Sequence, residues 1–214
     1  MKRYRVIATV WLVALAQVGS CYGEDQSGQI RNFPIRTIEN LGQDLFKRDA
    51  LAAAAFDLLF EVHPEAKEQS LGGWITRIGK KGSRVYLLKR KSEETRQAYV
   101  AVFEKNQKPR IELHLDEPLP KEIARRFRAR TAAIRALPGF YDRPYNFEVL
   151  NDPDGKGFIV YSLVSAKNAN EVVVGGHSRV TVSEDAGTIE AVDALSESLL
   201  SSTGSEPRRD RWHR

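Results

Sequence analysis

The spacing of apolar residues alternates between the helical and the strand period, and this alternation constrains the fold more than any other feature of the chain. Residues 35–63 carry apolar side chains at intervals of three, four and seven, and Pro64 ends that segment. A second helical segment at 121–137 ends at Pro138. Each is followed by four short segments of strand character: 74–78, 84–90, 97–105 and 110–116, then 146–150, 158–166, 172–183 and 188–195. The pattern predicts an α+β fold, two helices each followed by an antiparallel strand meander, in the order α-β4-α-β4.

The repeated order predicts one globular body at residues 35–200, with two similar halves at 35–120 and 121–200. With 42% hydrophobic residues, the chain has enough apolar side chains to bury a core. No repeat of individual residues between the halves accompanies the repeated order.

The segment 110–116 alternates strictly between apolar and polar residues. Its apolar members are Ile111, Leu113 and Leu115, and its polar members are Arg110, Glu112, His114 and Asp116. Because successive side chains of a strand point to opposite faces, we expect the apolar three to be buried and the polar four to face water.

The first 20 residues have the layout of a secretory signal peptide. Basic residues Lys2, Arg3 and Arg5 precede an apolar run at 6–18, and small residues follow at Gly19 and Ser20. The run is shorter than the roughly 20 residues that a membrane-spanning helix needs. We therefore expect residues 1–20 to be removed on export. The alternative is a buried N-terminal helix.

Cys21 is the only cysteine, and it stands where bacterial lipoproteins are acylated. Val18-Gly19-Ser20-Cys21 resembles a lipobox, in which a small residue precedes the cysteine that receives the diacylglycerol. The alternative is ordinary cleavage after Ser20 or Gly23. Residues 21–34 are then predicted to form a tether, with Cys21 as the one contact with a membrane. The predicted location is the periplasm or the outer membrane of a Gram-negative bacterium.

The net charge of +5 belongs to the two ends of the chain. Of 33 basic and 28 acidic residues, three basic ones lie within 1–23, and four basic and two acidic ones lie within 204–214, which leaves 26 of each between. A neutral body lacks the basic field that attracts a phosphate backbone, so we expect no nucleic-acid partner. Residues 201–214 are predicted to be a disordered basic tail.

The sequence contains no recognised catalytic or metal-binding motif. The four histidines, His63, His114, His177 and His213, lie far apart, and the one cysteine is assigned to the N-terminal segment. Zinc sites need several ligands at close spacing, so we predict no metal and no cofactor. No glycine-rich phosphate loop, nucleophile elbow or His-Glu-x-x-His run occurs.

The best candidate binding site is centred on His177 and Arg179. If 172–183 is one strand, these side chains share a face with Thr181 and Ser183, while Val180 and Val182 face the core. An imidazole beside a guanidinium is suited to a carboxylate or phosphate group. Tyr145 and Asn146 are predicted to join this patch. The alternative is an exposed sheet face whose polar residues are solvated or paired across strands.

A second candidate surface is the basic face of the helix at 121–137. Its members are Lys121, Arg125, Arg128 and Arg135. Such a face is suited to anionic lipid headgroups or to an acidic partner. The alternative is an ordinary solvated helix face, partly neutralised by Asp116, Glu117 and Glu122.

One resemblance rests on scattered segments. They are Val173-Val-Gly-Gly-His-Ser-Arg-Val-Thr-Val-Ser183, then Asp185 and 194–198, with Tyr145-Asn146 and 45–50. These segments are similar to a group of uncharacterised proteobacterial exported proteins. In that group a cysteine often follows the last segment, whereas Leu199 and Leu200 stand here. The resemblance implies export and an α+β body, and it implies no activity.

Two function classes follow from these observations. The first is a non-catalytic envelope protein that binds another envelope protein or a small anionic ligand. The alternative is a small periplasmic hydrolase with His177 as general base, helped by a carboxylate such as Asp185. Because no catalytic constellation is present, we assign no catalytic residue and favour the first class.

Overall fold

The computed structural model describes residues 30–68, 71–91, 94–137, 143–168, 171–196 and 198–203. The predicted signal peptide, Cys21 and the tail from residue 204 lie outside these ranges. Within them, no helix combines the length and apolar character that a membrane span requires.

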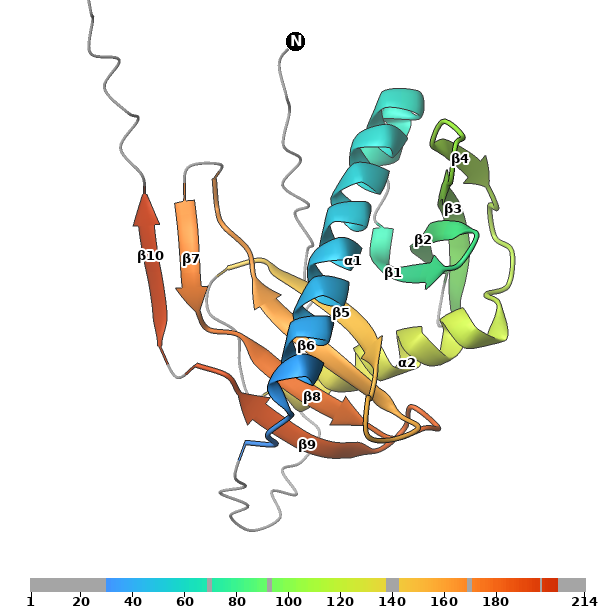
Figure 1. Cartoon of the computed structure of the whole chain (residues 1–214). Coiled ribbons are helices and arrows are strands. Elements are labelled where there is room, and N and C mark those ends of the chain that lie inside the picture. Colours follow the sequence, from blue (N-terminus) through green and yellow to red (C-terminus); the bar gives the residue numbers. More distant parts are fainter. Residues whose placement is uncertain are drawn as a thin grey trace, which may run out of the picture.

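The predicted α+β class is confirmed, because two helices accompany three antiparallel sheets (Figure 1). The elements are α1 (Ile35–Val62), the 3₁₀ helix η1 (Pro64–Glu68), β1 (Leu71–Gly79), β2 (Gly82–Lys91), β3 (Glu94–Glu104), β4 (Arg110–Leu113), α2 (Lys121–Ala136), β5 (Tyr145–Asn151), β6 (Phe158–Val164), β7 (Glu171–Gly175), β8 (Ser178–Val182), β9 (Ile189–Ala194) and β10 (Leu199–Thr203). The predicted order of four strands after each helix holds for α1. It does not hold for α2, which six strands follow.

Prolines set the limits of α1. Pro34 precedes the first turn, and its carbonyl accepts hydrogen bonds from the amides of Thr37 and Ile38. Pro64 cannot continue the helix, which therefore ends at Val62. Between them, the alanine-rich segment 50–55 has high helix propensity.

The first sheet has the order β1-β2-β3-β4 and buries both of its faces. One face packs against α1, and this core includes Ala55 and Leu59 of the helix with Val85 and Leu87 of β2. The buried helix residues at 52 and 55 are alanines, whose small side chains allow close packing of α1 against the sheet. The alternation of side chains along β2 sends Tyr86 and Leu88 to the other face.

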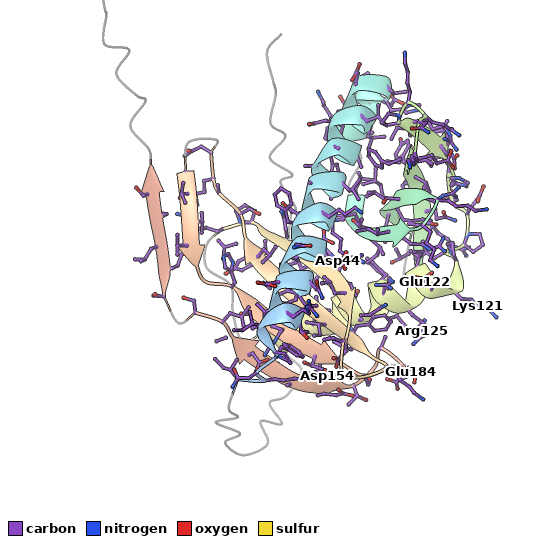
Figure 2. All side chains as sticks on the ribbon, in the orientation of Figure 1. Asp44, Lys121, Glu122, Arg125, Asp154 and Glu184 are labelled. Atoms are coloured by element: carbon purple, nitrogen blue, oxygen red, sulfur yellow. The ribbon has the colours of Figure 1, made fainter. Side chains whose placement is uncertain are left out.

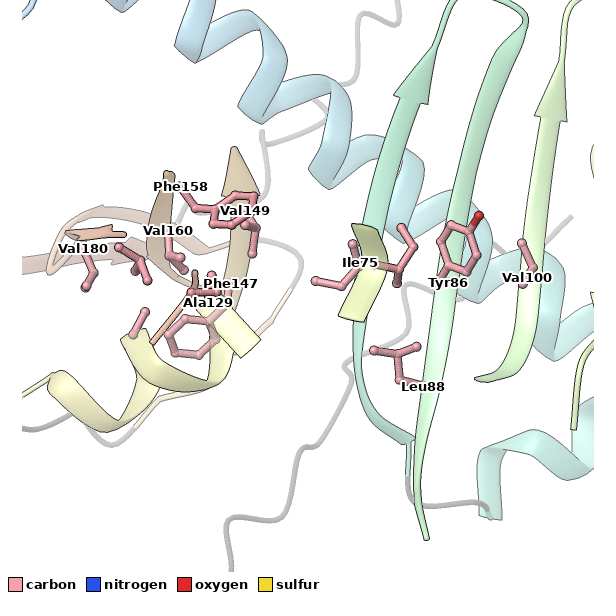
Figure 3. Close-up of a cluster of buried hydrophobic side chains, with 14 of the residues drawn as sticks. Ile75, Tyr86, Leu88, Val100, Ala129, Phe147, Val149, Phe158, Val160 and Val180 are labelled. Atoms are coloured by element: carbon pink, nitrogen blue, oxygen red, sulfur yellow. The ribbon is translucent and has the colours of Figure 1, made fainter. Parts of the chain in front are cut away.

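The second sheet has the order β5-β6-β8-β9 and shares that other core with the first sheet. Ile75, Leu88 and Val100 come from the first sheet, and Phe147 and Val160 come from the second (Figure 3). Helix α2 contributes Ile123, Ala129 and Ala133 to the same cluster. This shared core joins the two helix-and-sheet units into one body.

The predicted single strand at 172–183 is wrong, because Gly175 and Gly176 divide it into β7 and β8. The two glycines have φ of 86° and 69°, a backbone conformation that other residues adopt with strain. The chain therefore turns between them. Strand β8 enters the second sheet, whereas β7 leaves it and pairs with β10 in a separate two-stranded ribbon.

The predicted burial of the apolar face of the segment 110–116 holds only for Ile111, which packs against the core between α1 and the first sheet. Strand β4 ends at Leu113, and Asp116 has a positive φ of 65°. Leu113 and Leu115 are 54% and 57% exposed. On the polar face, the Arg110 guanidinium donates hydrogen bonds to Glu104 and Glu112.

Ordered structure extends past both predicted limits of the body. Strand β10 runs to Thr203, although 201–214 is predicted as a tail. At the other end Phe33, which belongs to the predicted tether at 21–34, is buried.

Candidate functional site

His177 lies in the short connection between β7 and β8, outside both strands. Its Nδ1 accepts a hydrogen bond of 3.1 Å from the backbone amide of Val164. Since an amide N–H only donates, Nδ1 carries no proton in this arrangement. Partial burial lowers the pKa of His177, which also favours the neutral ring.

Arg179 points into the protein and forms a buried ion pair. Its guanidinium lies 2.7 Å from the carboxylate of Asp193 on β9 and donates a 2.6 Å hydrogen bond to the carbonyl of Arg31. Both side chains of the ion pair are almost fully covered. The expected placement of His177 and Arg179 on one face of one strand is therefore wrong, and Arg179 is instead paired across strands with Asp193.

Tyr145 and Asn146 lie on opposite faces of β5, as neighbours in a strand must. The Tyr145 ring stacks with Phe147 at 6.2 Å between centroids, on the side of the shared core. On the other side, the Asn146 amide donates a 3.0 Å hydrogen bond to Asp49 of α1. His177 and Tyr145 both lie next to Val164, whereas Arg179 and Asn146 have other partners. The binding role of these four residues stays a prediction.

Residues 31–33, called the strap below, are docked on the second sheet. The Arg31 guanidinium donates two hydrogen bonds of 2.8 Å to Asp152 and one of 3.0 Å to Asp154, both in the turn between β5 and β6. These contacts raise the pKa of Arg31. Burial alone would raise the pKa of Asp152, but hydrogen bonds from Arg31 and from the Asp154 amide hold it below its ordinary value.

Phe33 completes the strap, and its ring contacts two guanidinium groups. Arg31 lies 4.7 Å and Arg179 lies 5.0 Å from the ring centroid. A cation over an aromatic face is attracted by the ring quadrupole, and this attraction grows when the groups are shielded from water. Sequence reasoning missed the strap, although the turn Asn151-Asp-Pro-Asp-Gly155 and the isolated Phe33 before a proline were visible signals.

A shallow surface pocket of about 410 Å³ lies beside the first turns of α2. Arg125 and Glu184 both line it, and the Arg125 guanidinium donates a 2.6 Å hydrogen bond to the carbonyl of Glu184, in the turn between β8 and β9. Figure 2 labels both residues. Glu122 and Lys156 also line the pocket, so its charges are mixed. Of the predicted basic helix face, Lys121, Arg128 and Arg135 are exposed to water.

Helix α2 also buries two arginines that the predicted basic face did not include. Arg126 donates hydrogen bonds to the carbonyl of Val149 and to the side chain of Asn151. The guanidinium of Arg130 lies 5.3 Å from the ring centroid of Phe147 and 5.8 Å from that of Trp74. Burial lowers the pKa of Arg130 to about 10.

Glu148 is buried in the same region, on β5. Its carboxylate accepts a 2.8 Å hydrogen bond from the indole nitrogen of Trp74. Burial raises the pKa of Glu148 to about 7, and the Trp74 hydrogen bond opposes that rise only in part. Within the described ranges, no three His, Cys, Asp or Glu side chains gather closely enough to hold a metal ion.

No protein-family model, no curated protein and no solved structure matches this chain.

Proposed function

We propose that this chain is an exported cell-envelope protein, a non-catalytic binding or structural module held to the membrane by a lipidated Cys21. The proposal begins with the N-terminal layout: a basic start, a short apolar run, and a single cysteine after small residues. It places the body in the periplasm or at the outer membrane of a Gram-negative bacterium.

The docked strap is the structural observation that carries the proposal. Soon after the predicted acylation site, Arg31 and Phe33 attach the chain to the second sheet. Residues 22–30 then remain as the tether, which spans at most about 30 Å at about 3.4 Å per residue. A tether of this length keeps the body close to the bilayer surface and directs the strap side toward the anchor.

In the hydrolase alternative, Asp185 lies too far from His177 to assist it as a general base. His177 precedes β8 and Asp185 follows it, so a five-residue strand separates the two residues. At about 3.3 Å per residue, the two side chains lie well beyond hydrogen-bond distance. Asp185 instead accepts hydrogen bonds from Ser183 and from the amide of Gly187.

The mixed charge of the surface pocket favours a protein partner over a small anion. Arg125 and Lys156 contribute positive charge there, but Glu122 and Glu184 lie on the same rim. A lone phosphate or carboxylate would meet repulsion from these two carboxylates. A protein surface with alternating charges would complement both signs.

Palmitate labelling tests the lipid anchor. We expect the wild-type chain to incorporate label and to partition into detergent, and the Cys21→Ser variant to do neither. The matched variant Ser20→Ala keeps a small residue before the cysteine and should be labelled like the wild type. No label on the wild type, with all material in the soluble periplasmic fraction, contradicts the anchor and leaves export standing. Met1–Ser20 peptides at full stoichiometry in the folded, fractionated protein contradict the removal of residues 1–20.

Cross-linking in living cells tests the binding role. A photo-reactive side chain at Lys156 is expected to capture one envelope protein, which mass spectrometry identifies. The same group at Lys105, an exposed residue in the turn between β3 and β4, is the control and should not capture that protein. Equal capture from both positions contradicts a binding surface at the pocket.

A further inference from the structure

Strands β7 and β10 form a ribbon that the rest of the protein leaves largely uncovered. Among the residues that the structure describes they pair only with each other, over five residue pairs from Leu199–Gly175 to Thr203–Glu171, and stand apart from both helices (Figure 1). The contact with Arg143 fixes one side of the ribbon, since this guanidinium donates hydrogen bonds to Glu171 at 2.6 Å and to Ser201 at 3.1 Å. The opposite side has no comparable contact among the described residues.

Three of the four side chains on that opposite side are aliphatic, and the fourth is Ser202. Val172, Val174 and Leu200 are 63%, 60% and 64% exposed. The register places Leu200 directly across from Val174, so the three side chains share one face of the ribbon. A small cluster of exposed aliphatic side chains on a sheet is a common mark of an interaction surface.

The outer edge of β10 lacks the features that protect sheet edges. Its sequence, Leu199-Leu-Ser-Ser-Thr203, contains no charged residue and no proline, and its pairing with β7 has no bulge. Natural edge strands usually carry such features because their free N–H and C=O groups otherwise pair with another strand. The backbone groups along this edge are therefore suited to pairing with another extended strand.

We propose that the occupant is β10 of a second copy of this chain, paired antiparallel about a two-fold axis. The two ribbons would form a four-stranded sheet in the order β7-β10-β10-β7. Two-fold pairs are the commonest assemblies, and an uncharged strand meets no like charge when it faces itself. The six aliphatic side chains of the two ribbons come together on one face of the new sheet.

The ends of the chain are compatible with this arrangement. The basic segment that contains Arg208 and Arg209 follows β10 directly in the sequence. In an antiparallel pair, the two copies of Thr203, the last residue of β10, lie at opposite ends of the new sheet, so the pairing does not bring the basic residues of the two copies together.

The size of the contact predicts weak association. Each copy contributes one short strand and three aliphatic side chains, which belongs to the class of interfaces below about 1,200 Å². We expect dissociation constants between about 10 μM and about 1 mM. The pairing does not depend on Cys21, because it uses only residues of the folded body.

Sedimentation of the full chain with Cys21→Ser, across that concentration range, is the test. We expect a reversible monomer–dimer equilibrium. Leu200→Lys should raise the dissociation constant at least tenfold, because a charge on the edge opposes pairing. Leu113→Lys is the matched control, an aliphatic residue of similar exposure on the edge strand β4, and should change the constant less than twofold.

Amide hydrogen exchange identifies the surface that pairs. Exchange in the peptide covering 199–203 should slow several-fold as the protein concentration rises, and Leu200→Lys should abolish the slowing. A chain that stays monomeric at every concentration overturns the proposal. So does a dimer that leaves exchange at 199–203 unchanged, or one that Leu113→Lys weakens as much as Leu200→Lys.

Discussion

Glu148 is a buried carboxyl whose protonation state is expected to change the stability of the protein. Its pKa is about 7 in the folded protein because of burial, against an ordinary value of 4.5. A carboxyl whose pKa is raised by folding stabilises the folded state fully below its ordinary pKa. That stabilisation is lost as pH rises from about 4.5 through about 7, at about 1.4 kcal/mol for each pH unit between these two values.

Glu148→Gln should therefore make the protein more stable at pH 8 by a few kcal/mol and have little effect near pH 4.5. The glutamine oxygen still accepts the hydrogen bond from Trp74, so the comparison isolates the charge. Urea unfolding at several pH values measures the effect. Glu190→Gln, at an exposed position of β9, should show no such pH dependence. Equal stabilisation by Glu148→Gln at pH 4.5 and at pH 8 would refute the assignment.

Two glycine-to-alanine substitutions are expected to have opposite effects on stability. Gly73 has φ of 132°, and an added Cβ would lie 2.9 Å from the buried guanidinium of Arg130. Gly73→Ala should cost about 1–3 kcal/mol of unfolding free energy, as strained backbone positions do. Gly42 lies inside α1 with nothing near an added Cβ, so Gly42→Ala should add up to about 1 kcal/mol. Thermal unfolding of both variants tests this, and destabilisation by both would contradict it.

At the scale of elements, the Arg31 side chain makes the hydrogen bonds that join the strap to the turn between β5 and β6. Arg31→Ala removes three charge-assisted hydrogen bonds and leaves the Asp152 carboxylate, whose side chain is 5% exposed, without its main partner. We expect a loss of about 1.5–3 kcal/mol. Because folding lowers the pKa of Asp152, its stabilisation is present above the ordinary value of 3.8 and is lost as pH falls below it.

The control for the strap is Arg36→Ala, which removes an exposed cation from the first turn of α1 and should cost less than about 0.5 kcal/mol. Urea unfolding gives both values. A double-mutant cycle of Arg31→Ala with Asp152→Asn should give a coupling energy above about 1 kcal/mol. Additive effects of the two substitutions would mean that the ion pair does not hold the strap.

The elements that sequence predicts well are those with strong local signals. Proline on both sides and a helical period define α1 within one residue, and the glycine-containing turn before β2 marks the first hairpin. The break between β7 and β8 escapes prediction because a pair of glycines such as Gly175-Gly176 is also typical of a bulge within one strand. Strand β10 has no alternating pattern, since only pairing with β7 defines it. Tertiary partners, which a single sequence does not show, decide these cases.

The same lack of information about tertiary partners explains why the predicted arrangement of the candidate binding site is wrong. Sequence places Arg179 on a strand with an alternating pattern, which suggests an exposed arginine. Its partners, Asp193 and the carbonyl of Arg31, are 14 and 148 residues away in the chain. Spacing along one segment carries no information about such distant contacts. A buried arginine with distant partners is therefore easily mistaken for a ligand-binding one.

At the scale of the whole molecule, the net positive charge lies in the two ends of the chain and not in the body. The 26 basic and 26 acidic residues between 24 and 203 leave the body neutral. Several of its arginines are further neutralised in internal pairs, among them Arg31 with Asp152 and Arg179 with Asp193. The pI near 9.3 is consequently a property of the terminal segments and gives no reason to expect a nucleic-acid site on the body.

This separation predicts where any affinity for DNA resides. The chain with Cys21→Ser should bind duplex DNA weakly and only at low salt, because the four arginines at 208, 209, 211 and 214 release few counterions. Replacing these four by serine should abolish that binding. Replacing Lys80, Lys81, Lys105 and Lys108, four lysines in turns of the first sheet, should leave it within about twofold, since each of those turns belongs to the neutral body. Fluorescence anisotropy across a salt series measures all three proteins. Submicromolar affinity that survives the arginine replacements would show that the body itself carries a nucleic-acid surface, and would overturn the argument from charge.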